Sequence, residues 1–198
     1  MQEQTAHRKL ILASSSPYRK ILLDRLGFSF EIRSPDIDES GKSDESAGQL
    51  VSRLAREKAL EVANRVPSAL VIGSDQLAVH GERIVGKPGS ADNACRQLQE
   101  FSGQTVRFLS AVAVVCLDTA FSFQRTVETR VCFRDLSPEE IRRYVEREMP
   151  VDCAGSFKIE SGGAALFERV VSEDPTALIG LPLIATAQML RKAGFSLP

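Results

Sequence analysis

Histidine is scarce in this chain. Its 198 residues include only two, His7 and His80. A Ser-His-Asp triad or a histidine-rich zinc site is hard to build from two histidines. If the protein is an enzyme, carboxylates must therefore carry out proton transfer and ligate any metal. Oxygen ligands of this kind favour a hard divalent cation such as magnesium.

The chain also lacks an excess of charge, closely spaced cysteines and long apolar runs. Its formal net charge is -1, which argues against a protein whose main task is to bind a nucleic acid polymer. The four cysteines form no CxxC pair and no signal peptide is evident, so we expect reduced cysteines in a cytoplasmic protein. The longest apolar run, Ser110–Leu117, is far too short to cross a membrane.

What is present indicates a folded enzyme-sized domain. Hydrophobic residues make up 43% of the chain, enough for a sizeable core. The length fits one domain, or one domain folded as two lobes. Residues 1–8 are polar and we expect a flexible tail there. Residues 9–198 contain no internal repeat and no low-complexity linker, so we expect a single two-lobed domain over that range.

Strand-like and helix-like segments alternate along the chain, which is typical of an α/β fold. Two long stretches, Val106–Leu117 and Phe121–Phe133, are joined by a turn and predict an antiparallel ribbon, so the sheet must be mixed. Further strands are predicted at Leu10–Ala13, Phe28–Arg33 and Leu70–Gly73, with a hairpin over Leu77–Val85. Helices are predicted at Tyr18–Leu26, Gln49–Asn64, from Ser90 to near Gly103, from Ser137 to about Glu148, and at Leu181–Lys192.

The turn Ser14–Arg19 is a candidate phosphate cradle. A short strand runs into three serines and Pro17, after which a helix begins, with Ser16 suited to the N-cap. Free backbone N–H groups and the helix dipole attract an anion at such a place, and Arg19 and Lys20 add positive charge. The alternative is that Ser16 only caps the helix and that the basic side chains are solvated.

The position of Lys58 favours the phosphate cradle over a merely capped helix. It follows Leu54 by four residues and Ala55 by three, so it lies on the apolar stripe of its helix. A lysine on the buried side needs a partner, although snorkelling past the stripe is common. We expect Lys58 to reach a phosphate or the carboxylates of the loop over residues 34–45, where Asp36, Asp38 and Glu39 cluster.

Asp75 is the candidate catalytic carboxylate. It follows an apolar strand, and ligands of α/β sheets bind where strands end. There it can hold a metal, activate water, or both, whereas the alternative is an aspartate that begins a turn.

The nearby segment Gly81–Lys87 matches the opening of a Walker A loop. Pro88 replaces the required Ser or Thr, however, and the segment has hairpin character, so we reject a P-loop and keep Lys87 as a possible phosphate contact.

These segments occur in one particular order, which resembles the Maf family of nucleoside triphosphate pyrophosphatases. Each motif alone is weak, but the ordered series is specific and spans about Lys9 to Leu190. The motifs are Leu10-Ile11-Leu12-Ala13-Ser14-Ser15-Ser16-Pro17-Tyr18-Arg19, Asp38-Glu39, Glu57-Lys58-Ala59, Gly73-Ser74-Asp75-Gln76, Gly86-Lys87-Pro88, Ala154-Gly155-Ser156-Phe157-Lys158-Ile159-Glu160 and Gly180-Leu181-Pro182-Leu183.

The resemblance implies an elongated α/β molecule, usually a homodimer, with a central cleft between two lobes and kinship to inosine triphosphate pyrophosphatases. It implies hydrolysis between the α- and β-phosphates with a divalent metal (Mg, Mn or Co). By position, Asp75 is the proton acceptor and a metal ligand, and Glu39 is the other metal ligand. The implied phosphate-binding residues are Ser14, Ser16, Arg19, Lys20, Lys58 and Lys87. The family usually has two arginines after the serine turn, and Lys20 lacks the bidentate fork of the second one.

Branches of the family that prefer different bases differ at three positions. Tyr18, Gln76 and Glu160 resemble the branch that hydrolyses 7-methyl-GTP, which clears modified nucleotides. Methylation at N7 leaves guanine positively charged, and an aromatic face attracts such a ring. A carboxylate such as Glu160 can accept hydrogen bonds from the guanine N1–H and amino groups. The alternative is that Tyr18 faces the core and Glu160 is a surface acid.

Other functions stay open from the sequence. One is a dTTP/UTP pyrophosphatase of the same family. A second is a regulator of cell division that binds nucleotide without cleaving it. A third is a phosphomonoesterase, which releases orthophosphate instead of diphosphate.

Overall fold

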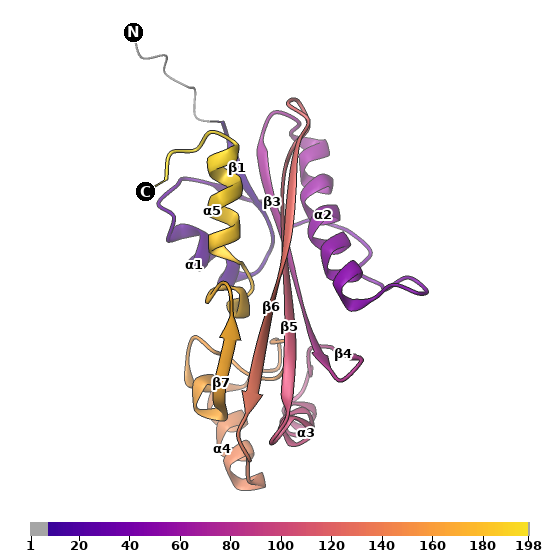
Figure 1. Ribbon diagram of the computed structural model, residues 1–198, viewed down its shortest axis with the longest axis vertical. Coiled ribbons are helices and arrows are strands. Elements are labelled where there is room, and N and C mark those ends of the chain that lie inside the picture. Colours follow the sequence, from indigo (N-terminus) through magenta and orange to yellow (C-terminus); the bar gives the residue numbers. More distant parts are fainter. Residues whose placement is uncertain (1–7, 198) are drawn as a thin grey trace.

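The sheet of the computed structural model, which describes residues 8–197, is mixed (Figure 1). Within that range seven strands occur in the order β2-β1-β3-β5-β6-β7, and β4 pairs with β3. β1 runs parallel to β2 and β3, whereas β5 is antiparallel to both β3 and β6. The predicted mixed α/β class is thus confirmed. The strands are β1 Leu10–Ala13, β2 Glu31–Ile32, β3 Leu70–His80, β4 Arg83–Val85, β5 Thr105–Cys116, β6 Phe121–Phe133 and β7 Phe167–Ser172.

Serine side chains cap four of the five α-helices in the described residues, and the fifth, α5 Leu183–Lys192, begins after Pro182 without a side-chain cap. Ser16, Ser90 and Ser137 each accept a hydrogen bond from a backbone N–H of the first turn, as predicted, and Ser46 does the same for a fourth helix. The α-helices are α1 Pro17–Asp24, α2 Ala47–Arg65, α3 Ala91–Phe101, α4 Pro138–Glu148 and α5 Leu183–Lys192, and short 3-10 turns occupy Gly162–Leu166 and Ala177–Ile179.

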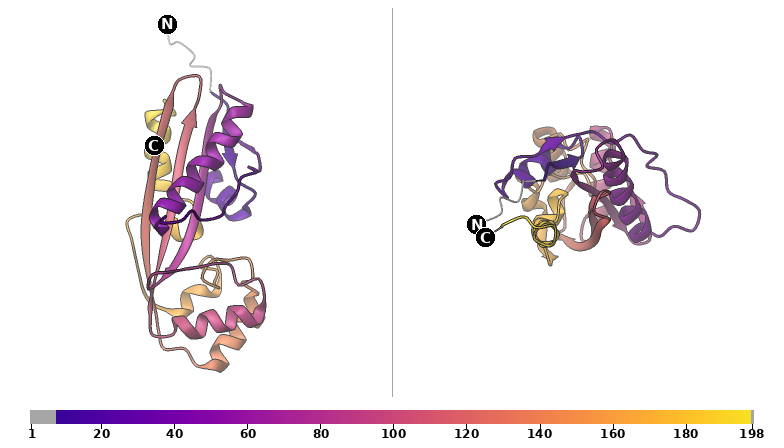
Figure 2. Two further views of the ribbon diagram at one scale, coloured as in Figure 1. Left: turned by 90° about the vertical axis from the view of Figure 1, so that its right-hand side faces the viewer. Right: turned by 90° about the horizontal axis from the view of Figure 1, so that it is seen from above.

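Three apolar clusters divide the elongated molecule into two lobes (Figures 1 and 2). In the upper lobe, a cluster with Leu22 and Met189 packs α1 and α5 against one face of the sheet. A second cluster with Val51 and Val62 packs α2 against the other face. The third cluster, with Phe101 and Ile141 among its members, joins α3 and α4 to the sheet in the lower lobe. The long strands β3, β5 and β6 connect the lobes.

Three strands differ from their predicted bounds. The segment Phe28–Arg33 forms a strand only at Glu31–Ile32, and β7 was not predicted at all. The prediction that the strand after Leu70 ends at Gly73 is wrong, because β3 continues to His80. Polar residues do not end this strand because they find partners: the Ser74 hydroxyl donates to the Ala111 carbonyl at 2.7 Å.

Two further sequence predictions can be compared with the structure. All four cysteines are free thiols. Among residues 8–197, no helix has both the length and the apolar character needed to cross a membrane. The predicted tail over residues 1–8 falls outside the described residues except for Arg8.

Candidate active site

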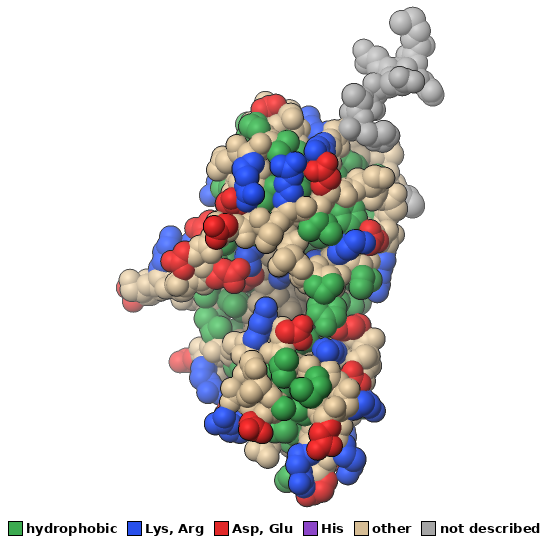
Figure 3. Space-filling model, turned by 180° about the vertical axis from the view of Figure 1, so that it is seen from behind, with side chains coloured by type: hydrophobic (Ala, Val, Ile, Leu, Met, Phe, Trp, Pro, Cys, Tyr) green, Lys and Arg blue, Asp and Glu red, His purple; other side chains and the backbone are tan. Residues whose placement is uncertain are grey.

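A pocket of about 590 Å³ opens where the two lobes meet, and Figure 3 shows the hollow on the surface. Both lobes supply its walls. The upper lobe contributes the β1–α1 turn, α2 and the middle of β3, and the lower lobe contributes the segment after β4 and the loop that follows α4. Its polar lining residues are Ser14, Ser15, Ser16, Tyr18, Arg19, Ser34, Glu39, Lys58, Asp75, Gln76, Lys87, Asp152, Cys153 and Glu160.

The turn between β1 and α1 fixes Arg19 at the pocket wall. Ser16 caps the helix and its own N–H donates to the Ser14 hydroxyl at 3.1 Å. The Arg19 Nε donates to the Gly180 carbonyl at 3.0 Å, and its Nη1 donates to Ser14 Oγ at 3.3 Å. The guanidinium is thereby held on two sides, with Nη2 4.0 Å from the Asp75 carboxylate. The structure brings Ser14, Ser16 and Arg19 together as predicted.

Gly73 lets α2 come close to β3. A Cβ atom at this position would lie 2.6 Å from the Ala59 nitrogen and even closer to the Ala55 carbonyl oxygen, both on α2. Only glycine therefore permits this separation between helix and strand. Lys58 lies between those two alanines along α2, so the close approach delivers its side chain to β3. The side chain is 7% exposed, which agrees with the predicted position on the apolar stripe.

Lys58 joins two carboxylates from distant parts of the chain. Its Nζ lies 2.6 Å from Asp75 Oδ1 and 2.7 Å from Glu39 Oε1. Asp75 thus projects from the middle of β3, paired with Ala111 of β5, and the predicted place at a strand end is wrong. The side-chain hydrogen bonds and ion pairs of Asp75 within residues 8–197 all use Oδ1. No buried side-chain oxygen in that range lacks a partner, so Oδ2 is open to water in the pocket.

Glu39 is the one acid of its loop that lines the pocket; neither Asp36 nor Asp38 does. Burial alone would raise the pKa of Glu39, but the hydrogen bond from Lys58 and the charges of Lys58, Lys87 and Arg19 outweigh burial and lower the pKa. Glu39 is therefore a carboxylate at neutral pH, poised beside the ammonium group.

The pair of carboxylates is chemically suited to a hard cation. Among the described residues there is no group of three His, Cys, Asp or Glu side chains that could hold a metal. Asp75 and Glu39 nevertheless approach one ammonium group from two sides. Magnesium is commonly held by one or two carboxylates, with substrate phosphates and water completing its shell. The donor set therefore fits a metal that enters together with a phosphorylated substrate.

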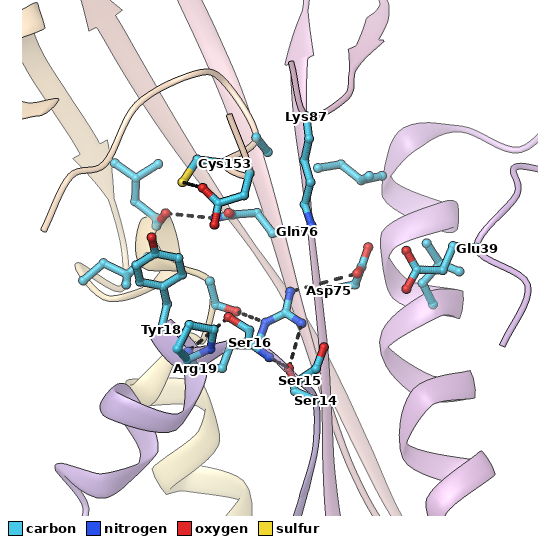
Figure 4. Close-up of a pocket in the computed structure, with 18 of the residues that line it drawn as sticks. Ser14, Ser15, Ser16, Tyr18, Arg19, Glu39, Asp75, Gln76, Lys87 and Cys153 are labelled. Carbon is cyan, nitrogen blue, oxygen red and sulfur yellow. Dashed lines mark hydrogen bonds and ion pairs between the residues drawn. The ribbon is translucent and has the colours of Figure 1, made fainter. Parts of the chain in front are cut away.

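Lys87 and Lys20 have different surroundings. Lys87 follows β4 and extends into the pocket toward the level of Asp75 (Figure 4), and the surrounding hairpin agrees with the rejection of a P-loop. Lys20, in contrast, is absent from the pocket lining; its Nζ pairs with Asp24 one turn along α1 at 2.7 Å, and half of its side chain is exposed. The structure does not bring Lys20 to the other predicted phosphate ligands, because helix periodicity turns it away from Arg19.

The opposite side of the pocket is acidic and aromatic. Tyr18 interacts electrostatically with the Cys153 thiol, and that thiol donates to Asp152 Oδ1 at 3.5 Å. Burial, followed by the charge of Asp152, raises the pKa of Cys153 to about 12, so the thiol stays protonated and is not a nucleophile. Burial also raises the pKa of Tyr18, and the charges of Asp152 and Glu160 raise it further.

Gln76 has its amide orientation fixed. Its Nε2 donates to the carbonyls of Ala177 and Leu178 at 2.9 and 3.0 Å and to Ser110 Oγ at 3.0 Å. No donor within residues 8–197 contacts Oε1, which is therefore a free acceptor on the pocket wall. We call Arg19, Lys58, Lys87, Asp75 and Glu39 the cationic end of the pocket, and Tyr18, Gln76, Asp152, Cys153 and Glu160 the acidic end.

Sequence reasoning missed Asp152 and Cys153 at the acidic end. Both lie just before a tight turn in which Gly155 and Ser156 have positive φ values of 79° and 59°. That turn directs the chain back into the pocket. The Gly-Ser pair is a turn signal in the sequence, but nothing local shows that the preceding acid faces Tyr18, more than a hundred residues away.

The family of this chain follows from a match along most of its length. The model for the family described as Maf-like protein matches residues 9–193. The chain belongs to the Maf family. The resemblance inferred from the ordered motifs is thus confirmed over nearly the whole chain.

Three relatives of this Maf protein at about 50% identity share one name. A protein of Alcanivorax borkumensis is 48% identical over 198 residues, covering 100% of both chains, and is named 7-methyl-GTP pyrophosphatase. Proteins with the same name occur in Albidiferax ferrireducens, at 49% identity over 94% of both chains, and in Pseudomonas aeruginosa, at 50% identity over 96% of this chain and 98% of the relative.

A solved structure shares the architecture of this Maf protein. The HAM1 protein from Coxiella burnetii aligns with a TM-score of 0.51 over 93% of this chain and 99% of its own, at 13% sequence identity. At that identity the likeness concerns the fold alone. It agrees with the two-lobed mixed sheet described above.

Proposed function

We propose that this Maf protein hydrolyses 7-methyl-GTP to 7-methyl-GMP and diphosphate, and thereby clears modified nucleotides. The observation that carries the proposal is the polarity of the pocket. Three cations and two carboxylates line one end, and an aromatic ring with two acids lines the other. A nucleotide with an anionic triphosphate and a cationic base has the complementary polarity. The name shared by relatives at about 50% identity supports the same reaction.

The cationic end suits the triphosphate. Arg19 is held rigidly by Gly180 and Ser14, so its guanidinium needs no reorganisation to meet a phosphate oxygen. Lys87 lies across the pocket from it and has no partner among the ion pairs of the described residues (Figure 4). These two groups can stabilise the charge that develops on the leaving diphosphate.

Asp75 is the proposed general base. Its Oδ2 is open to the pocket and can accept a proton from a water molecule. The water oxygen then attacks the α-phosphorus, the bond from that phosphorus to the α-β bridging oxygen breaks, and diphosphate leaves with its electrons. Lys58 holds Oδ1 at 2.6 Å, so the carboxylate keeps a fixed orientation during proton transfer.

A divalent cation is part of the proposal. Asp75 and Glu39 would hold it, and when bound it supplies positive charge that neutralises the phosphates. The Lys58 ammonium contacts both carboxylates and Arg19 lies 4.0 Å from Asp75, so these two cations offset the two negative charges. Lys58 also lines the pocket, where its charge can attract a phosphate oxygen.

The acidic end suits the methylated base. The Tyr18 ring offers an aromatic face to a cationic ring. The free Gln76 oxygen and the Glu160 carboxylate are acceptors, as required by the N1–H and amino donors of guanine. Uracil and thymine have no matching pair of donors, which disfavours dTTP and UTP as substrates.

We further propose a cytoplasmic homodimer, in line with the free cysteines and with the resemblance described above.

Product analysis tests the reaction. The protein is incubated with 7-methyl-GTP and magnesium or manganese, and the products are separated by ion-exchange chromatography. We expect equal amounts of 7-methyl-GMP and diphosphate. Orthophosphate as the first product would indicate a phosphomonoesterase, and intact nucleotide after long incubation would indicate a binding regulator; either result contradicts the proposal.

A further inference from the structure

Two carboxylates at the acidic end of the pocket have no cationic partner. None of the ion pairs formed within residues 8–197 includes Asp152 or Glu160, although Arg19, Lys58 and Lys87 line the same cavity. The one lysine between them in sequence does not neutralise them, because Lys158 Nζ donates to the Glu148 carbonyl at 2.8 Å. Both side chains are exposed, so water can hydrate their charges, but both line the pocket that Tyr18 lines and there they favour a ligand that brings positive charge.

Asp152 is held close to the aromatic ring. The Cys153 thiol donates to Asp152 Oδ1 at 3.5 Å and also interacts electrostatically with the Tyr18 hydroxyl. Asp152 is therefore connected to Tyr18 through one side chain, and its charge contributes to the raised pKa of that tyrosine. The Asp152 side chain is exposed, and its hydrogen bond within the described part of the chain uses Oδ1, so Oδ2 is open to a ligand.

Methylation reverses the electrostatic character of the N7 edge of guanine, from electron-rich acceptor to positively charged. In plain guanine N7 is a hydrogen-bond acceptor, so a carboxylate placed near it meets a lone pair and repels it. In 7-methylguanine the lone pair carries the methyl group and the imidazole ring is positively charged. The same carboxylate then attracts the base. One acid can thus favour the methylated base and disfavour the plain one, which is how specific sites gain discrimination.

We propose that Asp152 selects the N7-methylated, cationic base over plain guanine. Glu160 and Gln76 accept hydrogen bonds from the donors that both bases share, so they distinguish guanines from pyrimidines. Asp152 attracts the positive charge that only the methylated base carries. This inference rests on the proposed function, and it adds a specificity-determining residue that the ordered motifs do not contain.

The test compares two substrates in one variant. Asp152→Asn removes the charge but keeps an oxygen that the Cys153 thiol can reach, so the loop stays in place. We expect the ratio of kcat/KM for 7-methyl-GTP to kcat/KM for GTP to fall by at least about fivefold, as the loss of one nearby charge predicts. A purely structural fault would lower both values together and leave the ratio unchanged.

Matched variants sharpen the comparison. Asp118→Asn, on the β5–β6 turn outside the pocket, removes the same charge and should keep the wild-type ratio. Asp152→Glu, which restores the charge, should recover most of the ratio. Asp152→Ser, which also removes the charge, is assayed if Asp152→Asn folds poorly. An unchanged ratio in a folded Asp152 variant that lacks the charge would overturn the inference alone. A wild-type protein that does not hydrolyse 7-methyl-GTP would contradict the proposed function and the inference with it.

Discussion

The cationic and acidic ends of the pocket differ in how their charges are balanced. At the cationic end, Lys58 contacts both Asp75 and Glu39, and Arg19 is held by Ser14 and Gly180. Lys58, Asp75 and Arg19 belong to regular elements of the upper lobe, whereas Glu39 comes from the loop before α2. At the acidic end, Asp152 and Glu160 project from an irregular loop and have no ion pair within the described residues. A balanced, rigid network suits chemistry that is the same for every nucleotide, whereas unpaired groups on a loop suit selection among bases.

The largest expected effect is at Asp75. Asp75→Asn keeps the shape of the side chain but removes the base, so we expect kcat to fall by about a thousandfold. Diphosphate release measured under saturating 7-methyl-GTP checks this. Near-normal turnover in a variant with a wild-type circular dichroism spectrum would show that the cationic end works without Asp75 as its base.

Lys58 should come next in magnitude. Lys58→Met removes the ammonium and leaves two carboxylates facing each other, so we expect kcat/KM to fall by about a hundredfold for every nucleotide. Steady-state kinetics with both 7-methyl-GTP and GTP measure it. A fall in kcat/KM for only one of the two nucleotides would contradict the assignment of Lys58 to chemistry that is the same for every base.

Gly73 connects the sheet to the cationic end. Gly73→Ala places a methyl group against the Ala55 and Ala59 backbone, so α2 must move away from β3. We expect a loss of roughly 2 kcal/mol in the free energy of unfolding from this overpacking. Denaturant unfolding gives the value. Gly48→Ala on the same helix, where a Cβ has open space, is the control and should leave stability nearly unchanged.

A smaller and more selective effect is expected at Glu160. Glu160→Gln removes the charge and one acceptor from the acidic end, so kcat/KM for 7-methyl-GTP should fall by about tenfold. Turnover of UTP should be nearly unaffected, because uracil lacks the paired donors. Glu168→Gln on the exposed strand β7 is the matched control. Equal losses for both substrates would place Glu160 outside base recognition.

The smallest expected effects separate two lysines. Lys20 is paired with Asp24 outside the pocket, so Lys20→Ala should change kcat/KM by less than about twofold. Lys87 lines the pocket, so Lys87→Ala should raise KM by several-fold through the loss of one phosphate contact. Both variants are assayed side by side at low salt. A larger effect from Lys20 than from Lys87 would contradict the boundary drawn for the cationic end.

Local signals made much of the fold predictable. Ser90 and Ser137 begin helices where capping and proline patterns place them, and the apolar stripe that includes Leu54 marks Lys58 as a buried lysine. Each of these features depends on residues within one or two helical turns, where sequence spacing translates directly into geometry.

Long-range contacts were harder to predict. Asp75 lies in the middle of a strand because Ser74 and Gln76 find partners near Gly180 and Ala177, about a hundred residues away, and no local pattern shows that. The edge strand β7 lacks the alternation of a half-buried strand, since both its faces are largely exposed. Asp152 could not be assigned to the acidic end for the same reason, because its place in the same pocket as Tyr18 depends on how the lower lobe folds back.

The central claim is that the polarity of the pocket matches a nucleotide with a cationic purine. The most direct test is kcat/KM for a panel of methylated and plain nucleoside triphosphates with the wild-type protein, measured as diphosphate release at one metal concentration. We predict that 7-methyl-GTP is hydrolysed faster than GTP, and that both are hydrolysed faster than UTP and dTTP. Faster turnover of UTP than of 7-methyl-GTP would contradict the account.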